Sequence, residues 1–383
     1  MKPLTTPAME NIRQTLQNRW VFLFVIALGL NLRMGAAILG HNFDMESWYI
    51  VADIMRHGGN VYAETGRYNY GPVWFLVLHV LDMLAAHRHE VLRYLIAGVL
   101  SLADLGIFLI LCRQAGRVAG VLFFLNPVSI LISGYHCQFD NVAILIGLCS
   151  MLLFGDDFQG PLTRRKFLGL LVLGLSLMTK HVFFVFSIWL AVKQKGLWQK
   201  IIIVFVPSAC FLLGFLPFWA GSQHGIIDNV FHYQSYSGAF FYKFFIPLCI
   251  QFCWDSRTVW YGLLLLFAFI CRTRNSFESM LIYTGVLVAF SPFTTNQYLA
   301  IPIALASVFP SVPFFIYSAV STLHLCADAK NGPRVWAGLE GRYEDLAIYV
   351  LCFALAWLLW KPQFLQLFQK IRQEIRVQLD LLK

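Results

Sequence analysis

Apolar runs of roughly 20 residues recur from one end of the chain to the other, and short polar segments separate them. Inside a bilayer every backbone polar group must be satisfied within the chain, so such runs predict membrane-crossing helices. The pattern predicts an all-α, polytopic membrane protein of about 12 transmembrane helices, with residues 1–383 forming a single transmembrane domain. The predicted spans are 20–39, 94–111, 118–135, 141–154, 167–179, 183–192, 201–220, 259–271, 280–292, 298–309, 314–326 and 346–360.

The positions of lysine and arginine set the orientation of these spans. If both termini lie in the cytoplasm, the inside segments hold 18 of the 29 basic residues, as the positive-inside rule requires. Residues 1–19 then form a retained cytoplasmic tail before a signal-anchor span, because no small-residue cleavage site precedes the first apolar run. Residues 362–383 alternate apolar and basic positions at helical spacing, which predicts an amphipathic helix on the cytoplasmic leaflet. Such a helix is either a surface anchor or a partner-binding segment.

The first outer loop, residues 40–93, is the longest polar segment and carries two acids, Asp44 and Glu46, directly after the first span. An apolar stripe at helical spacing follows them, which predicts a helix at the membrane surface. Asp44 precedes this helix, where it is a fixed functional carboxylate, a simple N-cap, or both. Residues 71–85 are apolar, but a full span there would place Arg113 and Arg117 outside. We therefore expect them to lie at the outer interface.

Composition excludes several functional classes. The chain is 58% hydrophobic, only 13% charged, and has a mean hydropathy of +0.66, whereas a soluble domain carries about 25% charged residues. The net charge of +9 does not indicate nucleic-acid binding, because topology accounts for most of the basic residues and no basic, aromatic run occurs. The nine cysteines lie mostly within apolar runs without CxxC spacing, which is typical of small buried hydrophobes.

Polar residues gather at the predicted outer turns. The turn between the third and fourth spans contains His136, Gln138 and Asp140, more polar side chains than a turn needs, although Asp140 as a helix cap among interfacial aromatics is an alternative. Lys180 and His181 occupy the next outer turn, where they could hold a phosphate as charged donors or extend to the lipid headgroups.

The remaining candidates are more dispersed along the chain. A later outer loop holds His232 and Tyr236, an aromatic surface that suits either a sugar ring or an interfacial tyrosine belt. Another polar outer turn contains Asn296, Gln297 and Tyr298, and Arg93 opens the second span. Asp104 lies within that span, where an unpaired charge is expensive, so we expect it to pair with Arg33 or a polar neighbour rather than to relay protons.

In order along the chain, these motifs resemble the GT-C superfamily of integral-membrane glycosyltransferases. The resemblance is carried by the acidic residue before the surface helix, the segment Tyr70–Trp74, the Asn-Pro span that ends in Gly134–Asn141, Lys180-His181 and the turn 291–298. It is closest to the dolichyl-phosphate-glucose-dependent glucosyltransferases and to bacterial enzymes that use polyprenyl-phosphate sugars. That family often has Pro-Pro where this chain has Gly71-Pro72.

The resemblance implies an inverting transfer of a hexose from a polyprenyl- or dolichyl-phosphate donor to a hydroxyl on a glycan, glycolipid or protein acceptor. Asp44 matches the family's general base, with Glu46 beside it. Lys180, His181 and Arg93 are the expected donor-phosphate ligands. The expected substrate-binding residues are Tyr70, His136, Gln138, Asp140, His232, Tyr236, Asn296, Gln297 and Tyr298.

The implied setting is a bacterial inner membrane or the endoplasmic reticulum, with the active site on the periplasmic or lumenal side. No cofactor is expected, because a lipid phosphate does not require a metal, although Glu46 beside Asp44 leaves a divalent-ion variant open. The alternative function is a multi-span transporter or flippase. Transporters usually carry polar groups at the bilayer midplane, and here only Arg33 and Asp104 lie deep in predicted spans.

Overall fold

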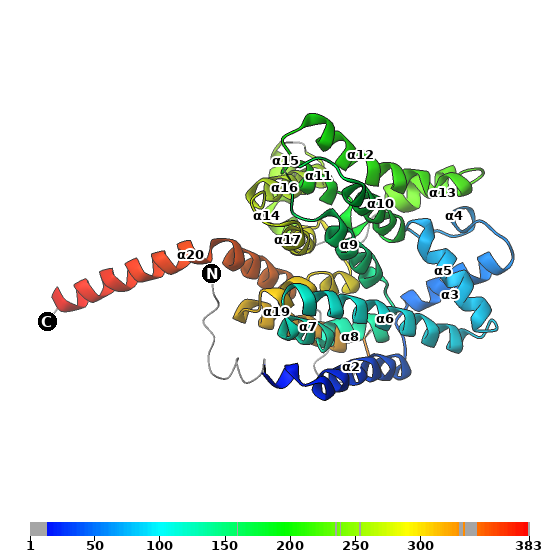
Figure 1. The fold of residues 1–383 in the computed structure, drawn as a ribbon, viewed down its shortest axis with the longest axis horizontal. Helices are drawn as coiled ribbons and strands as arrows, with labels where there is room; N and C mark the ends of the chain where they lie inside the picture. The colour runs from blue at the N-terminus through cyan, green and yellow to red at the C-terminus, as the bar shows by residue number, and fades with distance from the viewer. Residues whose placement is uncertain are drawn as a thin grey trace.

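The computed structural model describes residues 14–158, 160–233, 236–237, 239–252, 254–328, 332–333 and 343–381. This part is almost entirely helical, with one two-stranded antiparallel pairing (Figure 1). The first half contains α2 (Arg19–Leu39), α3 (Asp44–Arg56), α4 (Val61–Glu64), α5 (Pro72–Leu84), α6 (His89–Gln114), α7 (Arg117–Phe124), α8 (Pro127–Gly134), α9 (Asp140–Phe154), α10 (Arg164–Thr179), η1 (His181–Phe183) and α11 (Phe186–Ala191).

The second half carries the remaining helices and both strands. They are α12 (Leu197–Leu213), η2 (Leu216–Phe218), α13 (Gln223–Ile226), η3 (Ile227–Phe231), β1 (Tyr236–Ser237), α14 (Ala239–Phe244), α15 (Ile246–Phe252), α16 (Ser256–Ile270), α17 (Ser276–Ala289), β2 (Phe293–Thr294), η4 (Asn296–Ala300), α18 (Ile303–Val308), α19 (Val312–Ala327) and α20 (Glu344–Leu381).

Three described helices are long and apolar enough to cross a membrane: α2, α6, and α12 continued through η2. Large apolar side chains on α2 and α12, including Trp20, Phe24 and Phe205, are exposed, as expected of helices that face lipid. The other apolar helices α9, α16, α17 and α19 have 14 to 16 residues, a rise of about 21–24 Å. That is less than the roughly 30 Å hydrocarbon core, so the twelve-span topology stays a prediction.

The third predicted span, 118–135, is not one straight helix. It consists of α7 and α8, which are bent by 51° at residues 125–126, and it becomes a fourth crossing segment only if the bent pair is counted as one. Asn126 caps α8 by accepting a hydrogen bond from the backbone N–H of Val128, and Pro127 follows at the first helical position. The residue before a proline is disfavoured in the helical conformation, so the chain bends there.

Two other predicted spans also differ from the helices observed. The span 183–192 consists of η1 and the six-residue α11, and the span 298–309 consists of η4 and the six-residue α18. At the C-terminus, the predicted span 346–360 and the predicted surface helix are one continuous helix, α20, which projects away from the body (Figure 1). The side chains from residue 364 onward lie outside the described part, so the amphipathic surface anchor stays a prediction.

The deepest charges pair as expected. The Arg33 guanidinium donates from Nε to Oδ2 of Asp104 over 2.7 Å, and both side chains are fully buried. Asp104 also accepts hydrogen bonds from Ser129, Ser133 and Asn141. A buried ion pair is tolerated only when additional hydrogen bonds satisfy its remaining atoms, and this network supplies them. It ties α2, α6, α8 and α9 together.

The segment 40–93, predicted to be the first outer loop, contains α3, α4 and α5, which lie together at the end of the molecule opposite the C-terminal end of α20 (Figure 1). On α3 the expected apolar stripe faces inward, because Met45, Trp48 and Ala52 are all buried. The 13-residue α5 rises about 20 Å, close to the other short apolar helices, so its position at the interface stays a prediction. These helices have a hydrophobic core of their own, which also includes Phe139 from the turn before α9.

Gly71 allows this loop to approach the end of α10 closely. A Cβ atom on Gly71 would lie 2.0 Å from the backbone oxygen of Met178. The hydroxyls of Tyr62 and Tyr68 donate to the backbone oxygens of Tyr70 and Gly71, respectively. The segment before α5 is thereby held against the residues that precede Lys180.

Candidate active site

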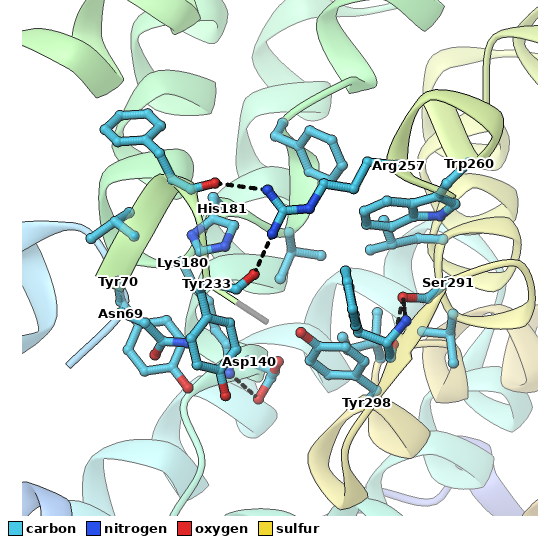
Figure 2. A pocket seen from close by; sticks show the side chains of 18 of the residues that line it. Asn69, Tyr70, Asp140, Lys180, His181, Tyr233, Arg257, Trp260, Ser291 and Tyr298 are labelled. Atoms are coloured by element: carbon cyan, nitrogen blue, oxygen red, sulfur yellow. Dashed lines mark hydrogen bonds and ion pairs between the residues drawn. The ribbon is translucent and has the colours of Figure 1, made fainter. Parts of the chain in front are cut away.

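A cavity of about 290 Å³ opens between α16, η1 and the segment before α5 (Figure 2). Part of its lining comes from four segments that the sequence predicts to be outer turns or loops, namely 68–74, 136–141, 180–181 and 291–298. The labelled residues in Figure 2 are Asn69, Tyr70, Asp140, Lys180, His181, Tyr233, Arg257, Trp260, Ser291 and Tyr298. Most of the remaining lining is apolar and includes Phe184, Phe211, Tyr261 and Leu287. Apolar walls with a few convergent polar groups are typical of ligand sites.

An ion pair stands at one end of the cavity. The Lys180 ammonium lies 2.7 Å from Oδ2 of Asp140, and the two side chains are 5% and 1% exposed. Lys180 also lies over the rings of Tyr70 and Phe139, at 4.7 and 4.9 Å from their centroids. The alternative that Asp140 is a helix cap is wrong: Asp140 is the first residue of α9, where it pairs with Lys180, and the preceding residue Phe139 makes no side-chain cap.

His181 is a neutral neighbour of this pair. Burial, assisted by the adjacent Lys180 charge, lowers the pKa of His181 to about 4. The imidazole is therefore uncharged at neutral pH, which corrects the expectation that Lys180 and His181 act together as charged donors. It can still exchange hydrogen bonds with a ligand, because its Nδ1 atom is buried and has no partner among the described residues.

Arg257 supplies a second cation that sequence reasoning missed. Its guanidinium donates to the backbone oxygens of residues 231, 232 and 233, with the shortest contact, 2.8 Å, to Tyr233. No described residue forms an ion pair with it. A signal was present in the sequence: Asp255 caps α16 by accepting from the N–H groups of Arg257 and Thr258. A cap at Asp255 marks the start of a helix, which puts Arg257 in its first turn.

Polar atoms without partners concentrate in the turn 136–141, of which Asp140 lines the cavity. In the described part of the chain, no group bonds to His136 Nε2, Gln138 Oε1, Asp140 Oδ1 or Asn141 Oδ1, although all four atoms are buried. Folded proteins satisfy most buried polar atoms, and each one left unpaired costs about 1–3 kcal/mol. Of these four atoms, only Oδ1 of Asp140 belongs to a residue that lines the cavity, so it is the one available to a ligand there.

Asp44 lies close to this turn but does not line the cavity. It is half-buried at the first residue of α3, not at the cap position, and its Oδ2 accepts from the side-chain amide of Asn42. The carboxylates of Asp44 and Asp140 both act on Tyr70, whose pKa is raised well above its ordinary value first by burial and then by these two charges. Burial, and to a smaller extent the Asp44 charge, also raises the pKa of Asp140, so the two carboxylates are electrostatic neighbours.

Aromatic packing fixes α3 against the turn 136–141. The indole N–H of Trp48 donates to the backbone oxygen of Cys137 over 3.1 Å. The Trp48 ring contacts Tyr70, Trp74 and Phe139, with centroids 5.5 to 6.2 Å apart. Since Phe139 directly precedes Asp140, this cluster couples the position of Asp44 to that of the Asp140–Lys180 pair.

Three expected site residues lie away from the cavity. Glu46 is exposed and faces Arg67 at 3.7 Å. Arg93 donates to the Tyr94 hydroxyl and does not line the cavity; burial raises the pKa values of Tyr49 and Cys137, and the nearby Arg93 charge only partly opposes that rise. His232 is exposed beside Asp228, and only its backbone oxygen reaches Arg257.

Of the candidates nearer the C-terminus, some line the cavity and others do not. Tyr298 lines the cavity. Asn296 instead bridges Asp328 and His324, with contacts of 2.9 and 2.8 Å, and Gln297 is buried outside the lining. The backbone of Tyr236 pairs with Thr294 in the short sheet, but its side chain lies outside the described residues.

Comparison with known proteins identifies no relative: no family model, no curated protein and no solved structure matches the chain. Within the residues that the structure describes, no group of three or more His, Cys, Asp or Glu side chains has the arrangement of a metal site.

Proposed function

We propose that this protein transfers a sugar from a lipid-phosphate donor to a hydroxyl acceptor, with Asp44 as the general base. The observation that carries the proposal is the convergence on one cavity of Lys180, Arg257 and Asp140, while the Asp44 carboxylate acts on Tyr70 in the same lining. The apolar part of the lining suits an isoprenoid chain, and the two cations suit a phosphate.

The reaction follows from these groups. Asp44 takes the proton of the acceptor hydroxyl, and the hydroxyl oxygen attacks the anomeric carbon of the donor sugar. The bond between that carbon and the phosphate oxygen breaks, and its electron pair leaves with the phosphate. The lipid phosphodiester becomes a phosphomonoester with additional negative charge, which Lys180 and Arg257 are placed to stabilise. A single displacement inverts the anomeric configuration.

Arg257 takes the role expected of Arg93, because it lines the cavity and Arg93 does not. Tyr70 and Tyr298 are the aromatic faces on which a sugar ring can pack, and Asp140 offers an acceptor oxygen to its hydroxyls. The buried Arg33–Asp104 network does not favour transport: the cavity beside it measures about 10 Å³, roughly the space for one water molecule.

The test is a transfer assay with purified protein and polyprenyl-phosphate sugars, in which mass spectrometry of glycolipids and glycans with and without the gene identifies the acceptor. We expect Asp44→Asn to remain folded and to lose transfer, because an amide cannot accept the proton. Asp53→Asn is the matched control, an exposed carboxylate on the same helix. Full transfer by Asp44→Asn excludes Asp44 as the base. Substrate flux into sealed liposomes that contain no lipid-linked sugar would instead support a transporter.

A further inference from the structure

Asn42 links Asp44 to a buried histidine. The Asn42 side chain is 5% exposed, and its Oδ1 accepts the backbone N–H of Asp44 over 3.1 Å. That bond fixes which end of the amide is the oxygen, because a backbone N–H can only donate. The two hydrogens of Nδ2 are then directed to Oδ2 of Asp44 and to Nδ1 of His136, each over 2.9 Å.

The tautomer of His136 follows from this bond. Since the Asn42 amide donates, Nδ1 of His136 must accept, and a neutral imidazole then carries its hydrogen on Nε2. His136 is fully buried, and burial lowers its pKa to about 4, so the ring is neutral at neutral pH. The neutral form is the one that can accept from Asn42.

The turn that carries His136 is hydrogen-bonded to α8 and locally strained. The backbone N–H of His136 donates to the Leu131 oxygen, and the next residue, Cys137, has a φ of +51°. A non-glycine residue in this left-handed region costs about 1–2 kcal/mol and persists only where surrounding contacts impose it. Trp48 supplies such a contact on the Cys137 oxygen. The contact between Trp48 of α3 and the Cys137 oxygen therefore fixes the positions of both His136 and Asp44.

We infer that Asn42 and His136 are positioning residues for the base: His136 orients the Asn42 amide, and Asn42 holds one carboxylate oxygen of Asp44 so that the other faces the acceptor. This role depends on the proposed function. No donor among the described residues reaches Oδ1 of Asp44, so that oxygen is available to the acceptor proton. Without the Asn42 amide the carboxylate rotates freely, and a displacement of about 1 Å at a reacting group can reduce the rate about 100-fold.

The experiment compares Asn42→Ala, His136→Leu and His136→Asn in the transfer assay, with Asp53→Asn as the control. Asn42→Ala and His136→Leu should lower kcat by about 10- to 100-fold while the donor KM changes by less than about twofold, because the cavity that holds the donor is untouched. His136→Asn should recover most of kcat, since its side-chain oxygen takes the place of Nδ1. The double variant Asn42→Ala/His136→Leu should be no slower than Asn42→Ala alone, because His136 acts through Asn42.

The outcomes separate this role from the proposed function. A wild-type protein that transfers no sugar overturns both. An active wild-type protein whose Asn42→Ala or His136→Leu variant keeps its kcat overturns the positioning role alone. So does a loss at His136 that His136→Asn fails to restore, or a double variant whose losses multiply. Thermal unfolding of each variant accompanies the kinetics: a variant whose midpoint falls while its kcat is retained contributes to folding only, and the positioning role is then refuted.

Discussion

The Asp140–Lys180 pair sets the charge of the cavity, and Asp140→Asn should therefore strengthen its binding of a phosphate. The described lining contains two cations, Lys180 and Arg257, and one carboxylate, Asp140, whereas His181 is neutral because its pKa is lowered to about 4. One net positive charge remains to face an anionic ligand. The substitution to asparagine keeps the shape of the side chain and raises this net charge to two.

The magnitude follows from Coulomb's law. A phosphate about 6 Å from the Asp140 carboxylate is repelled by about 3 kcal/mol at an effective dielectric constant of about 20. Removal of that repulsion corresponds to roughly 100-fold tighter binding. The ligand-free protein should become less stable by about 3–5 kcal/mol, because the buried Lys180 ammonium loses its counter-charge. A bound phosphate replaces that counter-charge, so it should raise the unfolding midpoint of Asp140→Asn more than that of the wild-type protein.

The assay is calorimetric titration of the detergent-solubilised protein with a ten-carbon isoprenyl monophosphate, alongside thermal unfolding with and without it. Lys180→Met should have the opposite effect on phosphate affinity. It leaves the Asp140 carboxylate without its counter-charge, so the affinity should fall roughly 100-fold. Arg93→Gln is the matched control, a cation outside the cavity lining, and should change affinity by less than about threefold. The reasoning is refuted if Asp140→Asn binds the phosphate no more tightly than the wild type, or if Arg93→Gln weakens binding as much as Lys180→Met.

Three further predictions concern the fold around the site. Asp104→Leu should lower the stability in detergent by about 3–5 kcal/mol because Arg33 is left buried and uncompensated, whereas Arg33→Met/Asp104→Leu should recover much of the loss; equal losses would contradict this account. His136 has a pKa lowered from 6.5 to about 4. Between these values the unfolded state binds the extra proton, so the unfolding midpoint should fall as pH drops from 6.5 to 4, and less steeply in His136→Asn. Gly71→Ala should lower the midpoint by several degrees, because its Cβ would lie 2.0 Å from a backbone oxygen of α10; Gly98→Ala, with open space around its Cβ, should not.

Most of the helices could be predicted from the sequence, because apolar periodicity is a local signal. The runs that became α2 and α6 are long, apolar and uninterrupted, and both helices extend over their predicted spans. The stripe of α3 and the pairing of Arg33 with Asp104 were also predictable, since a buried charge requires a partner and few candidates exist in apolar runs. The bend at Asn126-Pro127 could have been predicted from the cap and the proline. The apolar pattern instead predicts one span over residues 118–135.

The composition of the site depended on the tertiary structure. The sequence indicated that Lys180 and His181 belong to an outer turn, but not that Asp140 neutralises Lys180 from 40 residues away or that burial keeps His181 uncharged. Arg257 and Asn42 have only local signals, a helix cap and a position two residues before a helix, and such signals are common in loops. The roles of Arg257 and Asn42 depend on the residues that the tertiary fold brings into contact with them.

The chain by itself thus determined its helical character, its apolar runs and the polar turns that hold candidate chemistry, because these depend on side-chain type and spacing along one segment. Packing decided which turns meet. Gly71 against α10 and Trp48 against the Cys137 oxygen bring Asp44, Tyr70 and Asp140 into electrostatic range. Burial and neighbouring charges then set the protonation of each group, and neither quantity is defined until the segments have packed together.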